Sequence, residues 1–425
     1  METLRKYISY LPVFSLLLLV ASLPFHYGAF QRISLYSLAV TIPLDYVINQ
    51  RWQQWKWTSK HWVYVAFILF FCLIPISQLF DPLKTFLYPH TIERYLPFLV
   101  IGILGILGMT DKVRIEYVGW TMMLVSAAII VYVMSLIDIQ SITTMKEWIN
   151  SFNMLSHHHF NTHMVLNLYW NITLVLALNI IGRRRISWWM RLMAIMLSLP
   201  ITFSLFITDG RTGIITAALI ILIFLIYKMI KHRHWWLTIV ALIFMTIASI
   251  SVTQHDRFMA ATKETNPRIY IWNIALQMIA EKPVLGYGLC SARDQFVQRG
   301  LNDKDFYDNY VADLMYEMNM KHDKVRLEIM HPHNAILETW TQFGLIGVIL
   351  LLACWILPFT MKLGREQLYL NLCVLAFVLQ AQFESMGNNL QPMYLCLIVF
   401  LFHSHALGKR AKRFYSHIST PPPLR

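Results

Sequence analysis

The sequence consists of long apolar stretches separated by short polar connections, and this pattern constrains the fold more than any other feature. A helix needs about 20 apolar residues to cross a bilayer, and twelve stretches come near that length. Apolar and aromatic residues make up 57% of the 425 positions and charged residues only 14%, whereas a soluble domain carries about 25% charged residues. We therefore predict an all-α, polytopic membrane protein with about 12 transmembrane helices and one large external helical loop.

The predicted spans divide the chain into four parts. Residues 1–253 hold the first nine helices, residues 254–334 an external loop domain, residues 335–407 the last three helices and residues 408–425 a tail. Two basic residues near the N-terminus precede an apolar run without a small-residue cleavage site, so the first span is expected to stay uncleaved. The twelve spans are expected at residues 9–25, 33–49, 62–80, 94–109, 117–138, 164–182, 188–208, 212–229, 236–253, 335–360, 369–385 and 389–406.

The basic residues set the predicted orientation. If both termini are cytoplasmic, the connections on that side hold twenty Lys and Arg, and the short connections on the other side hold five. This asymmetry follows the positive-inside rule, so the net charge of +13 is explained by topology. Because the cations form no single basic face, the charge does not indicate a nucleic-acid-binding protein. The five external cations are Arg32, Lys84, Arg94, Lys146 and Arg211.

The external loop domain contains a predicted amphipathic helix. Its apolar residues recur at helical spacing, Lys282-Pro283 ends the helix, and Gly286-Tyr287-Gly288 turns the chain. We expect this segment to lie as a cap against the membrane helices. The apolar residues are Ile269, Trp272, Ile274, Ala275, Met278 and Ile279.

His333 stands where the external loop enters the tenth span. Asn334 is a good N-cap for the helix that follows, and Pro332 restricts His331 to an extended conformation, so His333 is displayed at a defined height. An imidazole can accept a proton from a hydroxyl near neutral pH. Two interpretations stay open: His333 is a general base, or it only caps the helix, next to glycines that let helices pack closely.

Two arginines stand at predicted helix starts on the external side. Arg211 occupies a very short turn between spans seven and eight, and Arg268 opens the amphipathic helix of the loop. A guanidinium fork suits bidentate contact with phosphate, and a helix N-terminus attracts anions. The alternatives are a membrane-surface anchor or a pair with Asp209 for Arg211, and a plain surface position for Arg268.

These pieces occur together in one family. The string from His333 to Gly347 has the order His-Asn, nine residues, Gly, two residues, Gly, and it resembles the motif of the O-antigen ligase and polymerase superfamily of bacterial inner-membrane glycan transferases. Arg211 resembles the arginine that these proteins carry between two central spans, although Gly210 and Thr212 flank it where Ser and Gly are usual. The residues that look like the start of the family's periplasmic domain are Arg268, Trp272, Pro283 and Gly286-Tyr287-Gly288.

The resemblance implies a reaction and its partners. Family members move a glycan from undecaprenyl pyrophosphate to a hydroxyl. This reaction requires cations that stabilise the departing pyrophosphate and a base that accepts the proton of the hydroxyl. Arg211 and Arg268 would bind the pyrophosphate and His333 would be the catalytic base, with inversion and with no metal or other cofactor. The expected partners are an undecaprenyl-pyrophosphate-linked glycan donor, a lipid A-core or glycan acceptor and membrane lipids, at the periplasmic face of the bacterial inner membrane.

Further polar residues near span ends are candidates for supporting roles. Glu338 and Glu384 are expected either to orient His333 or bind sugar hydroxyls, or to hydrogen-bond between helices, and Asn334 and His331 are additional candidates for support or sugar binding. The cluster from His157 to His163 superficially suggests a metal site. Adjacent histidines on one short segment point apart, however, so we favour a place in the glycan pocket.

The function therefore has one leading interpretation and three alternatives. The leading interpretation is a ligase that moves a polysaccharide to lipid A-core. A polymerase would use another lipid-linked repeat as acceptor, and the shared motif does not separate the two. A protein O-oligosaccharyltransferase is less expected, because those relatives usually add a sizeable C-terminal domain. A twelve-helix transporter predicts internal repeats and interrupted helices near the midplane, and the sequence contains no clear repeat.

Overall fold

The computed structural model describes residues 2–26, 28–55, 57–58, 61–81, 89–110, 112–138, 144–183, 185–208, 210–232, 267–304, 332–361, 363–384 and 390–418, with positions 239, 243 and 246. Over this part of the chain every regular element is helical, as the sequence predicts. The α-helices are α1 (Glu2–Ile8), α2 (Leu11–Ser22), α3 (Gly28–Ile48), α4 (Trp62–Ser77), α5 (Pro89–Leu107), α6 (Ile115–Leu136), α7 (Met145–His159), α8 (His163–Ile181), α9 (Trp188–Ile207), α10 (Arg211–His232), α13 (Pro267–Glu281), α14 (Leu289–Asn302), α18 (Ala335–Thr360), α19 (Gln367–Ala381) and α20 (Leu390–Ile418). Short 3₁₀ helices are η1 (Arg51–Gln54), η3 (Gln78–Phe80) and η6 (Gly364–Glu366).

Many of these helices are apolar enough for a membrane. Among the described residues, six have the length and composition to cross a bilayer: Thr3–Ser22, Ile115–Leu136, His163–Ile181, Trp188–Ile207, Thr212–Lys231 and Ala335–Thr360. Three shorter apolar helices are Trp62–Ser77, Gln367–Ala381 and Leu390–Ala406. All nine overlap predicted spans, and α3 and α5 occupy the second and fourth. The predicted ninth span, residues 236–253, lies outside the described residues except for three positions, so the count of twelve stays a prediction.

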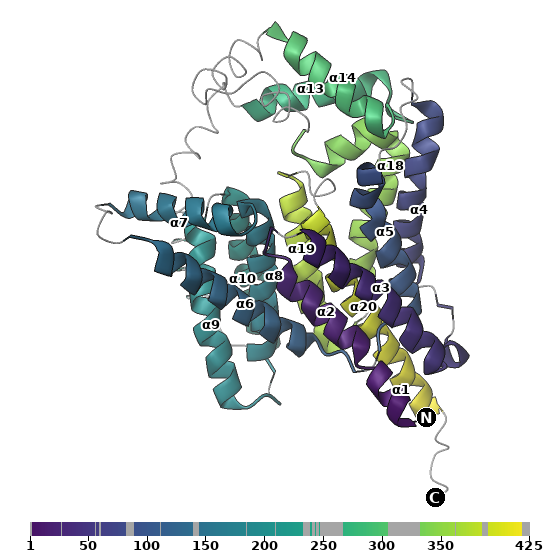
Figure 1. The fold of residues 1–425 in the computed structure, drawn as a ribbon, viewed down its shortest axis with the longest axis vertical. Coiled ribbons are helices and arrows are strands. Elements are labelled where there is room, and N and C mark those ends of the chain that lie inside the picture. The colour runs from purple at the N-terminus through teal and green to yellow at the C-terminus, as the bar shows by residue number, and fades with distance from the viewer. Residues whose placement is uncertain are drawn as a thin grey trace, which may run out of the picture.

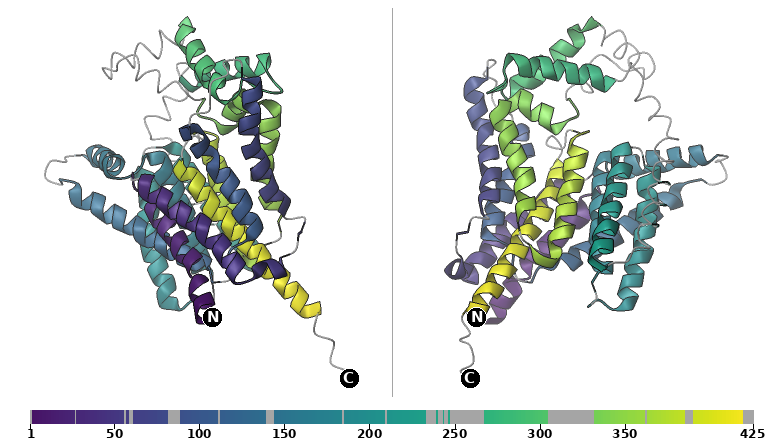
Figure 2. Two further views of the ribbon diagram at one scale, coloured as in Figure 1. Left: turned by 45° about the vertical axis from the view of Figure 1, so that its right-hand side comes forward. Right: turned by 180° about the vertical axis from the view of Figure 1, so that it is seen from behind.

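The helices form two packed groups that share a central seam. α4, α5, α18 and α20 make one group, and α6, α8, α9 and α10 make the other. α19 packs against α8, α10, α18 and α20 and so joins the two, as Figure 2 shows from behind. In Figure 1, α13 and α14 lie at one end of the molecule, and α1 and the C-terminal part of α20 lie at the other.

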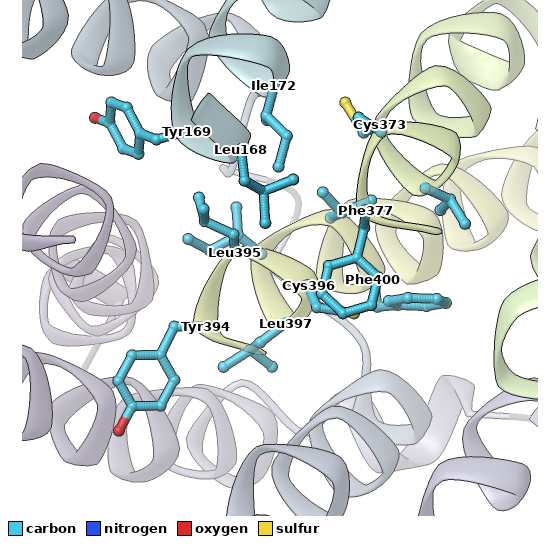
Figure 3. Packing of buried hydrophobic residues seen from close by; sticks show 14 of the residues in the cluster. Leu168, Tyr169, Ile172, Cys373, Phe377, Tyr394, Leu395, Cys396, Leu397 and Phe400 are labelled. Carbon is cyan, nitrogen blue, oxygen red and sulfur yellow. The ribbon is translucent and has the colours of Figure 1, made fainter. Parts of the chain in front are cut away.

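α8 forms the centre of this arrangement. Most of its circumference is apolar, which is typical of a helix enclosed by other helices, and 15 of its 19 residues are buried. Figure 3 shows side chains of α8, α19 and α20 meeting in this core. The labelled residues are Leu168, Tyr169, Ile172, Cys373, Phe377, Tyr394, Leu395, Cys396, Leu397 and Phe400.

We call residues 267–302, comprising α13, α14 and the connection between them, the cap. The cap has a small apolar core of its own, against which Leu337 of α18 packs. The predicted helix is present, but its buried face differs in one respect: Ile271 is 3% exposed, whereas Ile269, expected on the apolar face, is 47% exposed. The core residues are Ile271, Ile274, Ala275, Met278, Tyr287, Ala292 and Phe296.

The cap docks onto a break in α18. Gly344 has φ 65° and ψ −162°, so the helix is interrupted within the predicted tenth span. The freed carbonyls of Thr341 and Gln342 accept the amides of Tyr287 (2.9 Å) and Gly288 (3.0 Å). On the other side of the break, the amide of Leu345 donates to the carbonyl of Pro283 at 2.9 Å. The predicted close approach at Gly344 is therefore between this helix and the cap backbone.

A buried carboxylate fixes the second helix of the cap. Asp81 directly follows η3, is buried, and accepts the amide of Ser291 at 3.2 Å as well as its hydroxyl. Ser291 lies in the first turn of α14, where free amides and the helix dipole favour a negative charge. Gly288, with φ 84°, is needed here because a Cβ would come within 2.9 Å of the Asp81 carboxylate.

Two predicted cytoplasmic arginines make ion pairs at chain connections. Arg183, after α8, pairs with Glu116 at the start of α6 and, at 3.1 Å, with Glu366 of η6. Arg51 pairs with Asp45 at 3.0 Å and donates to the carbonyls that follow α5. These cations therefore join helices, beyond the anchoring expected from the positive-inside rule.

Replacing Gly344 by Ala should undock the cap. This combination of φ and ψ is essentially restricted to glycine and would strain alanine by about 1–3 kcal/mol, and the alanine Cβ would also overlap the Val284 carbonyl. We expect a loss of more than about 3 kcal/mol in cap stability, measured by thermal unfolding in detergent and limited proteolysis of residues 282–288. Gly364→Ala is the control, because Gly364 has φ 74° but no atom within 4 Å of a Cβ. Equal losses in both variants would contradict the docking role.

An ion pair inside the cap predicts a pH effect. Arg299 donates to both carboxylate oxygens of Glu281 at 2.6 and 2.7 Å, and the Tyr287 hydroxyl donates to the same group. These bonds, chiefly those from Arg299, lower the pKa of Glu281 from 4.5 to about 2. The pair therefore stabilises the cap fully above pH 4.5, and this contribution is lost as the pH falls towards 2.

Glu281→Gln should remove that contribution. We expect the difference in hydrogen-exchange protection of α14 between wild type and Glu281→Gln to be largest above pH 4.5 and to shrink as the pH falls towards 2. A difference that does not vary with pH over this range would show that the ion pair does not stabilise the cap.

Candidate active site

His333 lies in the connection that leads into α18 and has an unusual backbone. Its φ is 48°, in the left-handed region that residues other than glycine rarely adopt. Such conformations cost of order 1–3 kcal/mol and persist where the surroundings fix them. Asn334 supplies part of that fixation, because its side chain accepts the amides of Ile336 (2.9 Å) and Leu337 (3.0 Å). The predicted N-cap is confirmed.

Glu384 lies between His333 and Arg268. Its Oε2 is 3.7 Å from Nδ1 of His333, and its Oε1 is 3.8 Å from a terminal nitrogen of Arg268. Both distances exceed a hydrogen bond, so the contacts are electrostatic. The carboxylate follows α19, the imidazole precedes α18 and the guanidinium lies in the first turn of α13. Three elements far apart in the sequence thus meet at one point.

Two hydrogen bonds bring these elements together. Nε1 of Trp272, one turn after Arg268 in α13, donates to the carbonyl of Pro332 at 2.9 Å. Nδ2 of Asn334 donates to the carbonyl of Gln382 at 2.9 Å. The residues flanking His333 are therefore tied to the helix of Arg268 on one side and to the segment of Glu384 on the other.

Arg268 remains accessible at this junction. Its side chain is 40% exposed, and its guanidinium lies 5.9 Å from the ring centroid of Phe383, a distance at which a cation and an aromatic face attract. Sequence reasoning missed Phe383 and Gln382, since neither carries a charge or belongs to a recognisable motif. Their position next to Glu384 was the only signal.

Arg211 is the first residue of α10, and the structure describes the position of its backbone only. Gly210 and Gly213 let this turn press against α8, because a Cβ on either would come within 2.7 Å of the Asn167 side chain. α10 packs against both α8 and α19. The phosphate contact predicted for Arg211 remains a proposal, and His331 lies outside the described residues.

Glu338 lies in a different environment from Glu384. It is buried and accepts Nε2 of Gln342 at 3.3 Å, while Oε1 of Gln342 accepts the hydroxyl of Tyr95 at 3.0 Å. These three residues line a small cavity of about 30 Å³ between α4, α5, α18, α19 and α20. Among the contacts that the structure describes, His333 therefore has one with Glu384 and none with Glu338.

The histidines of residues 157–163 spread over two helices. His157, His158 and His159 end α7, and His163 begins α8. Across the part of the chain that the structure describes, no three His, Cys, Asp or Glu side chains are grouped so that they could hold a metal ion. Several of these histidines line a separate polar cavity.

Two substitutions at His333 should separate its backbone strain from its chemistry. Glycine adopts positive φ without penalty, so His333→Gly should unfold at a higher temperature than His333→Ala, by about 1 kcal/mol in stability. Both variants remove the imidazole and should lose activity alike. The measurement is thermal unfolding in detergent together with a transfer assay. A more stable alanine variant would show that residue 333 does not adopt the left-handed conformation.

Comparison with known proteins agrees with the motifs. Residues 192–352, which include Arg211, Arg268 and His333, match the O-antigen ligase family. The chain is 27% identical over 165 residues to a "putative polysaccharide ligase" of Rickettsia conorii, covering 37% of this chain and 36% of that protein. Proteins of the same description match in Rickettsia felis, at 25% over 166 residues (37% of each chain), and in Rickettsia prowazekii, at 26% over 163 residues (37% of this chain and 36% of that protein).

The matched segment thus covers little more than a third of each relative. The family match over residues 192–352 contains the cap, Gly344 and the residues Arg211, Arg268 and His333, whereas Glu384 lies outside it. Over residues 192–352 the chain is therefore similar to the O-antigen ligase family, in agreement with the motif spacing.

Proposed function

We propose that the chain transfers a glycan from undecaprenyl pyrophosphate to a hydroxyl of lipid A-core at the periplasmic face of the bacterial inner membrane, with both of its termini in the cytoplasm. The observation that carries the proposal is the meeting of His333, Glu384 and an accessible Arg268 at the cap end of the helices. The relatives described as polysaccharide ligases support a ligase over a polymerase.

In this reaction the acceptor oxygen attacks the anomeric carbon of the donor sugar. The bond between that carbon and the pyrophosphate oxygen breaks, and displacement from the opposite side inverts the anomeric centre. Nε2 of His333 takes the proton from the attacking hydroxyl. Glu384, near Nδ1, favours the tautomer with the proton on Nδ1 and stabilises the imidazolium that forms.

Arg268 and Arg211 stabilise the departing pyrophosphate. Charge grows on its oxygens as the bond breaks, and guanidinium groups held in place lower the energy of that state. Arg268 is suited to this role because its side chain is 40% exposed next to His333 and Glu384. Arg211 begins α10, whose N-terminal amides add to the attraction for an anion.

Removal of the His333 imidazole or of the Arg268 guanidinium should lower the rate of glycan transfer. With purified protein, lipid-linked donor and acceptor glycolipid, His333→Ala should lower kcat about 10²–10⁴-fold, and Arg268→Ala about 10²-fold or more. The matched controls are His61→Ala and Arg32→Ala, because His61 contacts Thr58 and Trp55, and Arg32 contacts Glu93. Full activity in His333→Ala would overturn the mechanism.

Deletion of the gene distinguishes the acceptors. Loss of a ligase should leave long glycans on the lipid carrier and a bare lipid A-core, whereas loss of a polymerase should leave single repeats attached to the core. Unchanged glycolipids together with loss of uptake or export of a solute would favour a transporter.

A further inference from the structure

A large polar cavity lies apart from His333, under α7. Its volume is about 380 Å³, within the range of about 300–1,000 Å³ found for small-molecule pockets. α7 forms one wall because Phe152 is buried against the bundle and Nδ2 of Asn153 donates to the carbonyl of Ile207, the last residue of α9, at 3.1 Å. The start of α8 and Thr208 complete the lining.

The lining is rich in uncharged polar groups. Its polar side chains include Asn150, Asn153, Ser156, His157, His158 and His163, and the described lining residues contain no Lys, Arg, Asp or Glu. Amides and hydroxyls both donate and accept hydrogen bonds. Such a lining suits a ligand with many hydroxyl groups better than an anion.

The neighbouring His26 joins the segment after α2 to the end of α7, because its Nε2 lies 2.9 Å from the carbonyl oxygen of His157.

Ser156 closes the cavity on its buried side. It lines the cavity and is only 2% exposed, and its hydroxyl oxygen has no hydrogen-bond partner in the described structure. The oxygen has less than 1 Å² of accessible surface, so a larger side chain at this position would extend into the cavity and reduce the space for a ligand.

The cavity borders the turn that starts α10. Thr208 belongs to its lining, and Gly210 lies so close to His163 that a Cβ would be 3.0 Å from its Cδ2. The next residue is Arg211. A ligand in this cavity would therefore lie beside the backbone of the residue proposed to bind pyrophosphate.

We infer that this cavity binds one neutral sugar unit of the transferred or receiving glycan. The inference rests on the proposed transfer function, which supplies glycans at this end of the molecule. Donor and acceptor glycans share the hydroxyl chemistry that the lining recognises, and kinetics distinguish them.

The test fills the cavity from the buried side. Two variants of the full-length protein are assayed in nanodiscs: Ser156→Val, and Asn150→Ala on the exposed side of the cavity. The concentrations of the lipid-linked donor and of the acceptor glycolipid are varied separately. We expect the KM for one of them to rise about tenfold or more with little change in kcat, because ground-state binding is lost. A rise in the donor KM assigns the sugar to the donor, and a rise in the acceptor KM assigns it to the acceptor. Ser151→Val makes the same change on α7 outside the lining and should leave both values unchanged.

Binding without turnover provides an independent readout. On the His333→Ala background, saturation-transfer NMR measures binding of the glycan released from the lipid carrier and of the acceptor oligosaccharide. Tenfold weaker binding of one glycan after Ser156→Val, but not after Ser151→Val, supports the pocket. Binding of neither glycan, or equal binding in folded Ser156→Val and Ser151→Val proteins, overturns it. Absence of transfer by the wild type, with sugar binding retained, would instead overturn the proposed function.

Discussion

At Gly344 the backbone of α18 leaves helical geometry, and the carbonyls of Thr341 and Gln342 turn to the amides of Tyr287 and Gly288. Backbone groups inside an apolar bundle must find partners, so the break and the docked cap segment require each other. Only glycine fits at position 344, because the Val284 carbonyl occupies the space of a Cβ. Through this contact the helix that follows His333 also carries the cap.

The remaining contacts of the site follow from that docking. Once the cap is seated, Trp272 reaches the carbonyl of Pro332, and Arg268, one turn earlier in α13, comes next to Glu384. The strained backbone of His333 is held between the Trp272–Pro332 hydrogen bond and the capping side chain of Asn334. A cation, a carboxylate and an imidazole are thereby held close together by hydrogen bonds of their neighbours.

Local features of the site could be predicted from the sequence. Helical spacing and Pro283 predicted α13, which ends at Glu281, and the residue type of Asn334 predicted its N-cap. These features depend on interactions within a few residues. The helix count stays open for a different reason, since α3 and α5 combine apolar stretches with charged residues and part of the chain lies outside the described residues.

Features that depend on distant partners could not be predicted. The glycine spacing suggested close packing of helices, but not that Gly344 interrupts its own helix to accept a segment about 60 residues earlier. Glu338 and Glu384 are equivalent by sequence, since both stand near span ends, and only the fold puts one beside Tyr95 and Gln342 and the other beside His333. The buried face of α13 likewise depends on where α14 and Leu337 lie.

The most direct test of this account is an experimental structure of the wild-type chain in nanodiscs with undecaprenyl pyrophosphate bound. The account predicts that the pyrophosphate lies at the cap end, within hydrogen-bond distance of the Arg268 guanidinium, about 2.7–3.2 Å, with His333 facing the position of the sugar. Pyrophosphate bound at the end that carries α1, or without contact to either Arg268 or His333, would contradict it.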